Sequence, residues 1–209
     1  MSRWVYFILA SFFLIVRAEI LVDLQKKFHG KNLVFQVEKS LSSEFLEKPQ
    51  ISEGKIYLTS GKLRWETTAP EKSLILFDGK TLWTQQSPNA DFPGPDQVTK
   101  SKISKKNASM LLFEKLLFQG NLKSSFAVTD EKKDADQTQL TLKPKADSLN
   151  LKSLKVVIQA KELLLREVSY IDEIGNKTQI KIQQTQVVPS FSKDLFIFKI
   201  PAKAQVQEL

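Results

Sequence analysis

The side chains that could carry out catalysis are few in this chain, and their spacing assembles no reactive set. His29 is the only histidine, and no cysteine, aspartate or glutamate stands beside it at the spacing of a metal site. A capping or solvent-exposed role is the better interpretation of its imidazole. The GxSxG, Walker, Rossmann and HExxH motifs are absent from the sequence. We therefore expect no enzyme, no metal and no cofactor; a lipid hydrolase would need a nucleophile, a histidine and an acid together.

The carboxylates stand mainly in predicted turns and on the polar faces of predicted strands, where water solvates them. No two of them are paired as general acid–base catalysis would require. The stretch DEIGN, residues 172–176, is predicted to be a hairpin turn, because it lacks the acidic spacing of a calcium loop.

The composition does favour the burial of large apolar groups. After residue 18 the chain carries eleven phenylalanines, together with Trp65, Trp83, Tyr57 and Tyr170. These side chains could fill an ordinary core. They could also line a cavity for an apolar ligand inside a curved sheet. Composition alone leaves both interpretations open.

One predicted hairpin raises the question of what covers each face of the sheet. In SLILFDGKTLW, residues 73–83, the central Asp-Gly accepts the positive φ angles of a hairpin turn, so the two apolar runs are predicted as paired strands. In the first run, Leu74 and Leu76 share one face, and Ile75 and Phe77 share the other. A strand with one hydrated face alternates apolar and polar residues. We therefore expect apolar cover on both faces here.

Two helices and roughly ten or eleven strands are predicted around this hairpin. Residues 19–28 carry apolar side chains at helical spacing, and Gly30 ends this helix. Residues 107–119 form a second helix, whose wide apolar stripe should lie against a large apolar surface. Regular short strands joined by turns, the last of them at residues 194–201, indicate an antiparallel meander that curls toward a barrel.

The first 18 residues have the pattern of a cleavable secretory signal. A positive start at Arg3 is followed by an apolar stretch of about a dozen residues and a small-x-small ending at Ala18. The apolar stretch is shorter than the roughly 20 residues that span a bilayer, so cleavage is favoured over a retained membrane anchor. Residues 19–209 would then form one domain. Without cysteine, an exported domain must be stabilised by a packed core or a closed sheet.

Basic residues exceed acidic ones, and the formal net charge of +8 falls to +6 when residues 1–18 are removed. The excess is scattered in lysine pairs, several of them beside acids. This pattern is typical of a solubilising surface; the alternative is a weak attraction to anionic lipid head groups or an acidic partner. We expect no nucleic-acid partner, because the basic residues form no aromatic-lined stripe.

Four sequence blocks together resemble a known family. GKLRWETTAPEKSLILFDGKTLW, residues 61–83, is similar to the signature block of the periplasmic outer-membrane lipoprotein carrier protein family, LolA. Three later blocks agree with this family in order and spacing: LTLKPK at residues 140–145, DEIGNKTQI from Asp172, and FIFKIP at residues 196–201. No cysteine follows the predicted signal, which separates the chain from the related receptor LolB, itself a lipoprotein.

The resemblance implies a mainly β (α+β) fold, an incomplete antiparallel β-barrel of about 11 strands with helices forming a lid over a hydrophobic cavity. It implies a monomeric periplasmic carrier that binds the acyl chains of lipoproteins released from the inner membrane and delivers them to the outer membrane. The partners would be a LolCDE-type ABC transporter and a LolB-type receptor, or the outer membrane directly. Two alternatives stay open: a carrier of free lipid or another amphiphile on the same fold, and a structural or adaptor protein.

Strand alternation assigns residues of this chain to the cavity and the lid that the resemblance implies. The cavity residues are Phe35, Leu58, Leu63, Trp65, Leu74 and Leu76, and the inward face of the lid is formed by Met110, Leu111 and Phe113. One departure concerns Thr59 and Ser60, which stand where the family usually has Arg-Pro. The resemblance implies that this arginine holds the lid by donating hydrogen bonds to backbone carbonyl oxygens of the lid. Because threonine has one hydroxyl donor and arginine five, we expect lid closure to differ here.

Overall fold

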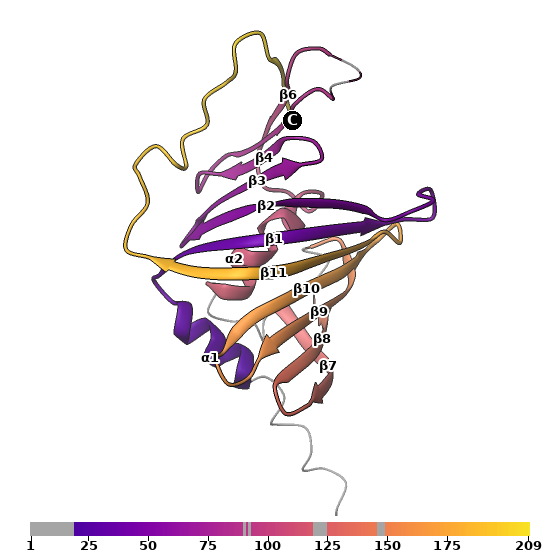
Figure 1. The fold of residues 1–209 in the computed structure, drawn as a ribbon, viewed down its shortest axis with the longest axis vertical. Coiled ribbons are helices and arrows are strands. Elements are labelled where there is room, and N and C mark those ends of the chain that lie inside the picture. The colour runs from indigo at the N-terminus through magenta and orange to yellow at the C-terminus, as the bar shows by residue number, and fades with distance from the viewer. Residues whose placement is uncertain (1–18, 90, 92, 119–124, 146–148) are drawn as a thin grey trace, which may run out of the picture.

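The computed structural model describes residues 19–89, 91, 93–118, 125–145 and 149–209. The predicted signal peptide, residues 1–18, lies outside the described residues, and so does the end of the predicted second helix at Gln119. Within the described part of the chain, twelve strands form one continuous curled sheet, and two short helices lie against one of its faces (Figure 1). No helix in these ranges is both long enough and apolar enough to cross a lipid bilayer.

The sheet consists of two meanders joined by the pairing of β1 with β11. From edge to edge the strand order is β12-β6-β5-β4-β3-β2-β1-β11-β10-β9-β8-β7. Neighbouring strands are antiparallel, except that β12 runs parallel to β6. The strands are β1 (Asn32–Ser42), β2 (Gln50–Thr59), β3 (Lys62–Ala69), β4 (Ser73–Phe77), β5 (Leu82–Gln86), β6 (Gln97–Ser101), β7 (Phe126–Lys133), β8 (Gln137–Pro144), β9 (Leu151–Gln159), β10 (Leu164–Asp172), β11 (Lys177–Val188) and β12 (Gln205–Glu208). This confirms the predicted mainly β, curled antiparallel architecture.

Alternation along the central strand gives the sheet one predominantly apolar face. In β1 the side chains of Leu33, Phe35 and Val37 are buried, and those between them are half-buried. Residues directly opposite one another in an antiparallel pair lie on the same face. This face, which packs against the helices, is called the inner face below, and the opposite one the outer face. Register shifts at four strand pairs, including one between Gln36 and Val37, are irregularities of the kind that bend and twist a sheet.

Two helices form the layer against the inner face. The amphipathic helix α1 (Glu19–Phe28) buries Leu21, Leu24 and Phe28, and Gly30 follows it with a φ of +69°, a left-handed conformation that ends helices. A 3-10 turn (Ala108–Leu111) leads into α2 (Leu112–Leu117), which lies behind the central strands in Figure 1. Both predicted helices are therefore present, although the second has only six α-helical residues.

The C-terminal residues differ from the prediction. Residues 194–201 were expected to form the last strand, but they are turn and irregular backbone within a segment, residues 189–204, called the C-terminal segment below. It leaves β11 at the centre of the sheet and runs past the ends of β2–β5 to the far edge (Figure 1). There the chain forms β12, and the sheet has twelve strands in place of the expected ten or eleven.

Candidate functional site

The inner face presents a continuous apolar surface across β1, β2 and β3. Leu33 lies opposite Leu58, Phe35 opposite Ile56, and Leu58 opposite Leu63. All five side chains are fully buried, and the half-buried Trp65, opposite Ile56, packs against them. The structure therefore places four predicted cavity residues on one face: Phe35, Leu58, Leu63 and Trp65.

The helix α2 closes over this surface through an aromatic contact. The ring centroid of Phe113 lies 5.8 Å from that of Phe35 and 6.2 Å from that of Trp65, the latter edge-on. Of the three residues assigned to the inward face of a lid, Leu111 and Phe113 are buried, whereas Met110 is only half-buried and lies outside the buried core cluster. The described chain thus shows a closed arrangement, with aromatic side chains occupying the space above the sheet.

The lid helix is buried on more sides than its sequence predicts. Leu112 and Leu116, which stand apart from the predicted apolar stripe, are 2% and 0% exposed. One side of α2 packs on the sheet, and another side is covered by α1. The buried Gln25 of α1 donates a hydrogen bond from Nε2 to the Leu116 carbonyl oxygen at 3.0 Å. A helix enclosed by a sheet and a second helix must be apolar nearly all round.

The assignment of Leu74 and Leu76 to the cavity is wrong. In the register of β3 with β4, Leu76 lies opposite Arg64 and Leu74 opposite Glu66, so both leucines face outward. Their places on the inner face are taken by two neighbours: Ile75 lies opposite Trp65, and Phe77 lies opposite Leu63. Because both faces of this strand are apolar, its side-chain pattern could not show which face is inward. The pairing register decides it.

The outer face of this strand is covered by the C-terminal segment. Leu76 is fully buried there. The Phe198 ring stacks on Trp83 of β5 with a centroid distance of 4.7 Å, and Phe191 meets Tyr57 of β2 edge-on at 6.1 Å. The buried Phe196 contacts Phe191 edge-on at 5.5 Å, so the segment's aromatic side chains form a connected cluster.

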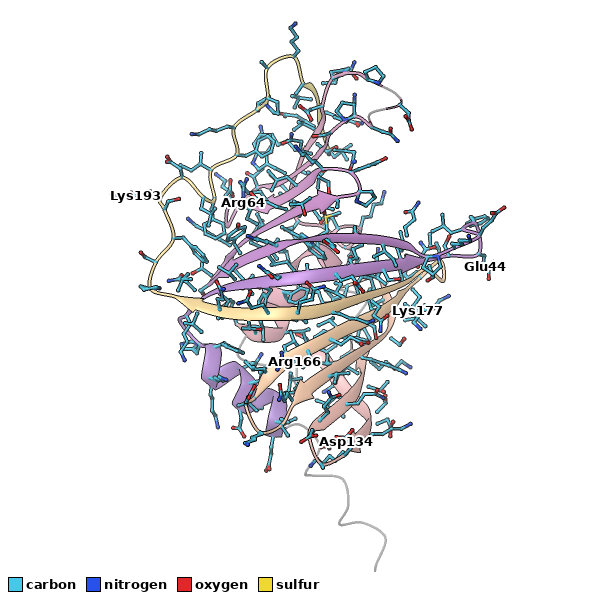
Figure 2. All side chains as sticks on the ribbon, viewed as in Figure 1. Glu44, Arg64, Asp134, Arg166, Lys177 and Lys193 are labelled. Carbon is cyan, nitrogen blue, oxygen red and sulfur yellow. The ribbon has the colours of Figure 1, made fainter. Side chains whose placement is uncertain are left out.

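Arg64 ties the C-terminal segment to the sheet. Its Nη1 donates to the Leu195 carbonyl oxygen at 3.2 Å, while its Nε donates to the Glu66 carboxylate at 2.6 Å. Figure 2 shows Arg64 on the sheet and Lys193 on the segment that runs beside it. This answers the question posed by the hairpin: helices cover one apolar face, and the chain's own C-terminal segment covers the other.

Thr59 and Ser60, which replace the family's Arg-Pro, lie at the end of β2 and in the turn that follows. Thr59 is half-buried and Ser60 exposed. The lid helix α2 is joined to α1 by the buried hydrogen bond that Gln25 donates to the Leu116 carbonyl oxygen.

Burial against this apolar interior shifts the pKa values of two ionisable side chains. Desolvation lowers the pKa of Lys39, which belongs to β1. Desolvation also raises the pKa of Tyr170 on β10, where a hydrogen bond with Thr178 acts in the opposite direction. Within the described ranges, no three histidine, cysteine, aspartate or glutamate side chains are grouped to hold a metal ion.

A small pocket lies between α1 and the end of α2. It has a volume of about 340 Å³ and is lined by Val22, Gln25, Lys26, His29, Leu117 and Phe118. His29 is exposed and follows α1, with its backbone N–H donating to the Gln25 carbonyl oxygen at 2.8 Å. The only histidine of the chain therefore lies beside the lid helix, and none of the residues that line this pocket with it is acidic.

Comparison with known proteins agrees with this arrangement. Residues 37–199 match the family model "Outer membrane lipoprotein carrier protein LolA". An outer-membrane lipoprotein carrier protein from Dechloromonas aromatica is 27% identical over 179 residues, which cover 84% of this chain and 81% of the relative. The protein of the same name from Chromobacterium violaceum is 27% identical over 177 residues, covering 80% of this chain and 81% of the relative.

Solved structures show the same fold at low sequence identity. An uncharacterized conserved protein from Thermus thermophilus superposes with a TM-score of 0.55 and 12% identity, covering 92% of this chain and 99% of that one. The structural likeness concerns the fold alone, whereas the family model spans most of the sequence, from Val37 within β1 through β11, and includes the lid helix α2. This chain belongs to the LolA family of outer membrane lipoprotein carrier proteins.

Proposed function

We propose that this protein is a periplasmic carrier that holds the acyl chains of lipoproteins released from the inner membrane and delivers them to the outer membrane. The observation that carries the proposal is the apolar inner face of the sheet, over which the short helix α2 packs through Phe113. Family membership supports the carrier role. The acyl chains would replace the Phe113 ring against Phe35 and Trp65.

The energetics of such a carrier favour a lid that opens. Each methylene group removed from water contributes roughly 0.8 kcal/mol, so exposed acyl chains are strongly unfavourable in water. A bilayer offers those chains nearly the same gain. A carrier therefore needs an affinity close to that of the membrane, a donor that supplies energy for loading, and an acceptor that binds more strongly. Binding by apolar area, without many directional hydrogen bonds, meets this requirement.

The route of the cargo follows from the same proposal. Residues 1–18 would direct export and be removed, and residues 19–209 would act in the periplasm as a single domain. A LolCDE-type ABC transporter would load the lipoprotein, and a LolB-type receptor or the outer membrane itself would receive it. Support for this route comes from the names of the relatives and from the signal-like N-terminal sequence.

The two tryptophans of the mature chain provide a direct test, because Trp65 lies on the inner face and Trp83 on the outer face. Single-tryptophan variants, Trp83→Phe and Trp65→Phe, would be titrated with a synthetic triacylated lipopeptide carrying brominated acyl chains, which quench fluorescence at contact. We expect quenching in the Trp83→Phe variant, which retains Trp65, and little quenching in the Trp65→Phe variant. Equal quenching of both would contradict binding at the inner face.

The identity of the natural cargo would be read by native mass spectrometry of the protein purified from its own periplasm. One acylated lipoprotein per chain is the expected result. Phospholipid or fatty acid alone would instead establish a carrier of free lipid on the same fold. A chain that emerges empty and binds no brominated lipopeptide would show that the inner face is core only.

A further inference from the structure

A single lysine interrupts the apolar inner face where that face meets solvent. Along β1 the inner-face side chains of Leu33, Phe35 and Val37 are 0%, 0% and 2% exposed, and the next residue in the alternation is the half-buried Lys39. From there the strand continues to the hairpin tip that carries Glu44 (Figure 2). Lys39 therefore marks the rim of the surface that we assign to the acyl chains.

The register confirms which face Lys39 occupies. It lies opposite Ile180 of β11, which is 1% exposed, and opposite Ser52 of β2. Its Nζ lies 5.8 Å from the ring centroid of Trp65, within the range of a cation–π contact. The ammonium group thus lies over an inner-face side chain. Ser52, the residue opposite Lys39 on β2, carries a hydroxyl group on the same face.

The positive charge at this rim has no acidic partner among the ion pairs of the described residues. The neighbouring Glu38 points to the outer face, where its carboxylate lies 3.9 Å from Lys181. The pKa of Lys39 is lowered because burial removes water from the ammonium, with no carboxylate to offset that loss. A partly desolvated cation gains more from an anionic partner than a fully hydrated one does.

We infer that Lys39, whose cross-strand neighbour on β2 is Ser52, binds an anionic oxygen at the polar end of the acyl ligand. This inference rests on the proposed function, since it requires the acyl chains to lie against the inner face. The group would be a carboxylate or phosphate joined to the acyl chains, either on an acidic residue next to the lipidated end of a lipoprotein or in a phospholipid head group. Lys39 would then fix which end of the ligand faces solvent and favour anionic over neutral amphiphiles.

The test compares ligands of equal chain length that differ in charge. Bound Nile red, a neutral probe, would be displaced from the mature protein by dodecanoate, dodecyl phosphate and dodecanol. In Lys39→Met we expect about tenfold weaker displacement by the two anions and no change for dodecanol, because one charge-assisted contact is lost. Lys39→Arg should retain the preference for anions. The matched control Lys181→Met, on the outer face, should behave as the unmodified protein.

The possible failures are separable. If none of the three compounds displaces the probe from the unmodified protein, the proposed function fails. If displacement occurs but Lys39→Met weakens all three ligands equally, or none, the inference about Lys39 is overturned. The source of the anion would be distinguished with phosphatidylglycerol and with two triacylated lipopeptides, one carrying an acidic and one a neutral residue after the lipidated cysteine. The ligand whose affinity falls in Lys39→Met carries the group that Lys39 binds.

Discussion

Leu63 and Leu76 are two fully buried leucines on opposite faces of the sheet. Substitutions at these positions distinguish effects on the stability of the core from effects on ligand binding. Leu63 faces inward toward the lid, and Leu76 faces outward beneath the C-terminal segment. Truncation of either to alanine should lower the free energy of unfolding by about 2–5 kcal/mol, because each leaves a cavity. Urea titration would measure this loss.

The same two variants should differ in their affinity for a triacylated lipopeptide. We expect Leu63→Ala to weaken binding about tenfold, since apolar contact with the acyl chains is lost, and Leu76→Ala to leave it unchanged. Weaker binding in Leu76→Ala alone would reverse the assignment of the two faces.

Gly54 occupies a position where no other residue fits without a shift of the backbone. A Cβ built at Gly54 would lie 2.1 Å from the Glu66 carbonyl oxygen and 3.1 Å from the Thr67 Cα, in the neighbouring strand β3. Gly54→Ala should therefore destabilise the protein by roughly 1–3 kcal/mol, since the register of β2 with β3 must adjust.

The matched control is Gly94, around which a Cβ would meet nothing within 4 Å. Gly94→Ala is expected to change the free energy of unfolding by no more than about 0.5 kcal/mol. Thermal or urea unfolding would compare the two variants. Equal stability would show that the strands can separate at Gly54 at little cost.

At this scale, the sequence predicts the inner face well where polar and apolar residues alternate. Phe35, Leu58, Leu63 and Trp65 follow from alternation because polar residues stand on the other face of their strands. The strand with Leu74 and Leu76 has apolar residues on both faces, so its pairing with β3 decides which face points inward. Lys39 could have been noticed as the polar residue that continues the buried series along β1, but a lysine at that position resembles ordinary surface.

At the scale of elements, the lid helix depends on its neighbour α1. The buried hydrogen bond from Gln25 to the Leu116 carbonyl links the two helices across 91 residues of sequence. Gln25→Leu removes this donor and should favour opening of the lid by about 1 kcal/mol, roughly a fivefold change in the equilibrium. Hydrogen exchange of the α2 amides would report it.

The control for this prediction is Lys26→Met, in the same turn of α1. Lys26 is exposed, and its ion pair with Asp23 lies at the surface. Such a pair contributes little to stability. Its removal should therefore leave the exchange of α2 unchanged. If Gln25→Leu also leaves exchange unchanged, the lid is held by apolar packing alone.

The C-terminal segment depends on Phe196, whose side chain is 7% exposed, whereas that of its neighbour Ile197 is 53% exposed. Phe196→Ala should destabilise the protein by about 3 kcal/mol and make residues 189–204 more sensitive to proteases. Ile197→Ala should do neither. Protection of the segment in Phe196→Ala would show that the contact of Phe198 with Trp83 is sufficient to hold it.

The elements show where sequence reasoning succeeds and where it stops. Most strands of the two meanders and both helices follow from periodicity and from turn residues, whereas β6 (Gln97–Ser101) lies in a polar, proline-rich stretch that carries no such pattern. The stretch FIFKI in the C-terminal segment alternates in the same way, yet it forms no strand because its neighbours in space are side chains of the outer face and not a free sheet edge. The burial of Leu112 and Leu116 likewise depends on α1, a partner distant in sequence.

At the scale of the whole molecule, the sheet carries separate covers on its two faces. The inner cover is short and held by packing and a side-chain hydrogen bond, and the outer cover is a long segment anchored by aromatic contacts and by Arg64. Opening of the lid would therefore leave the outer face covered. This arrangement suits a carrier, which must change one surface without losing the fold.

The C-terminal segment also constrains the order in which the chain can fold. The last strand, β12, pairs with β6, so Gln205 lies beside Gln97 although 108 residues separate them. Before the rest of the sheet has formed, this pairing would require a large loop to close, and such contacts form slowly. The pairing of β11 with β1 joins residues that are even farther apart, such as Asn32 and Val188. Once that pairing and the meander from β1 to β6 have formed, only residues 189–204 separate β11 from β12, so we expect β12 to pair with β6 last. The chain would thus complete its inner face before its outer face is sealed, and Trp83, which stacks on Phe198 only at the end, would report the covering of the outer face in refolding kinetics.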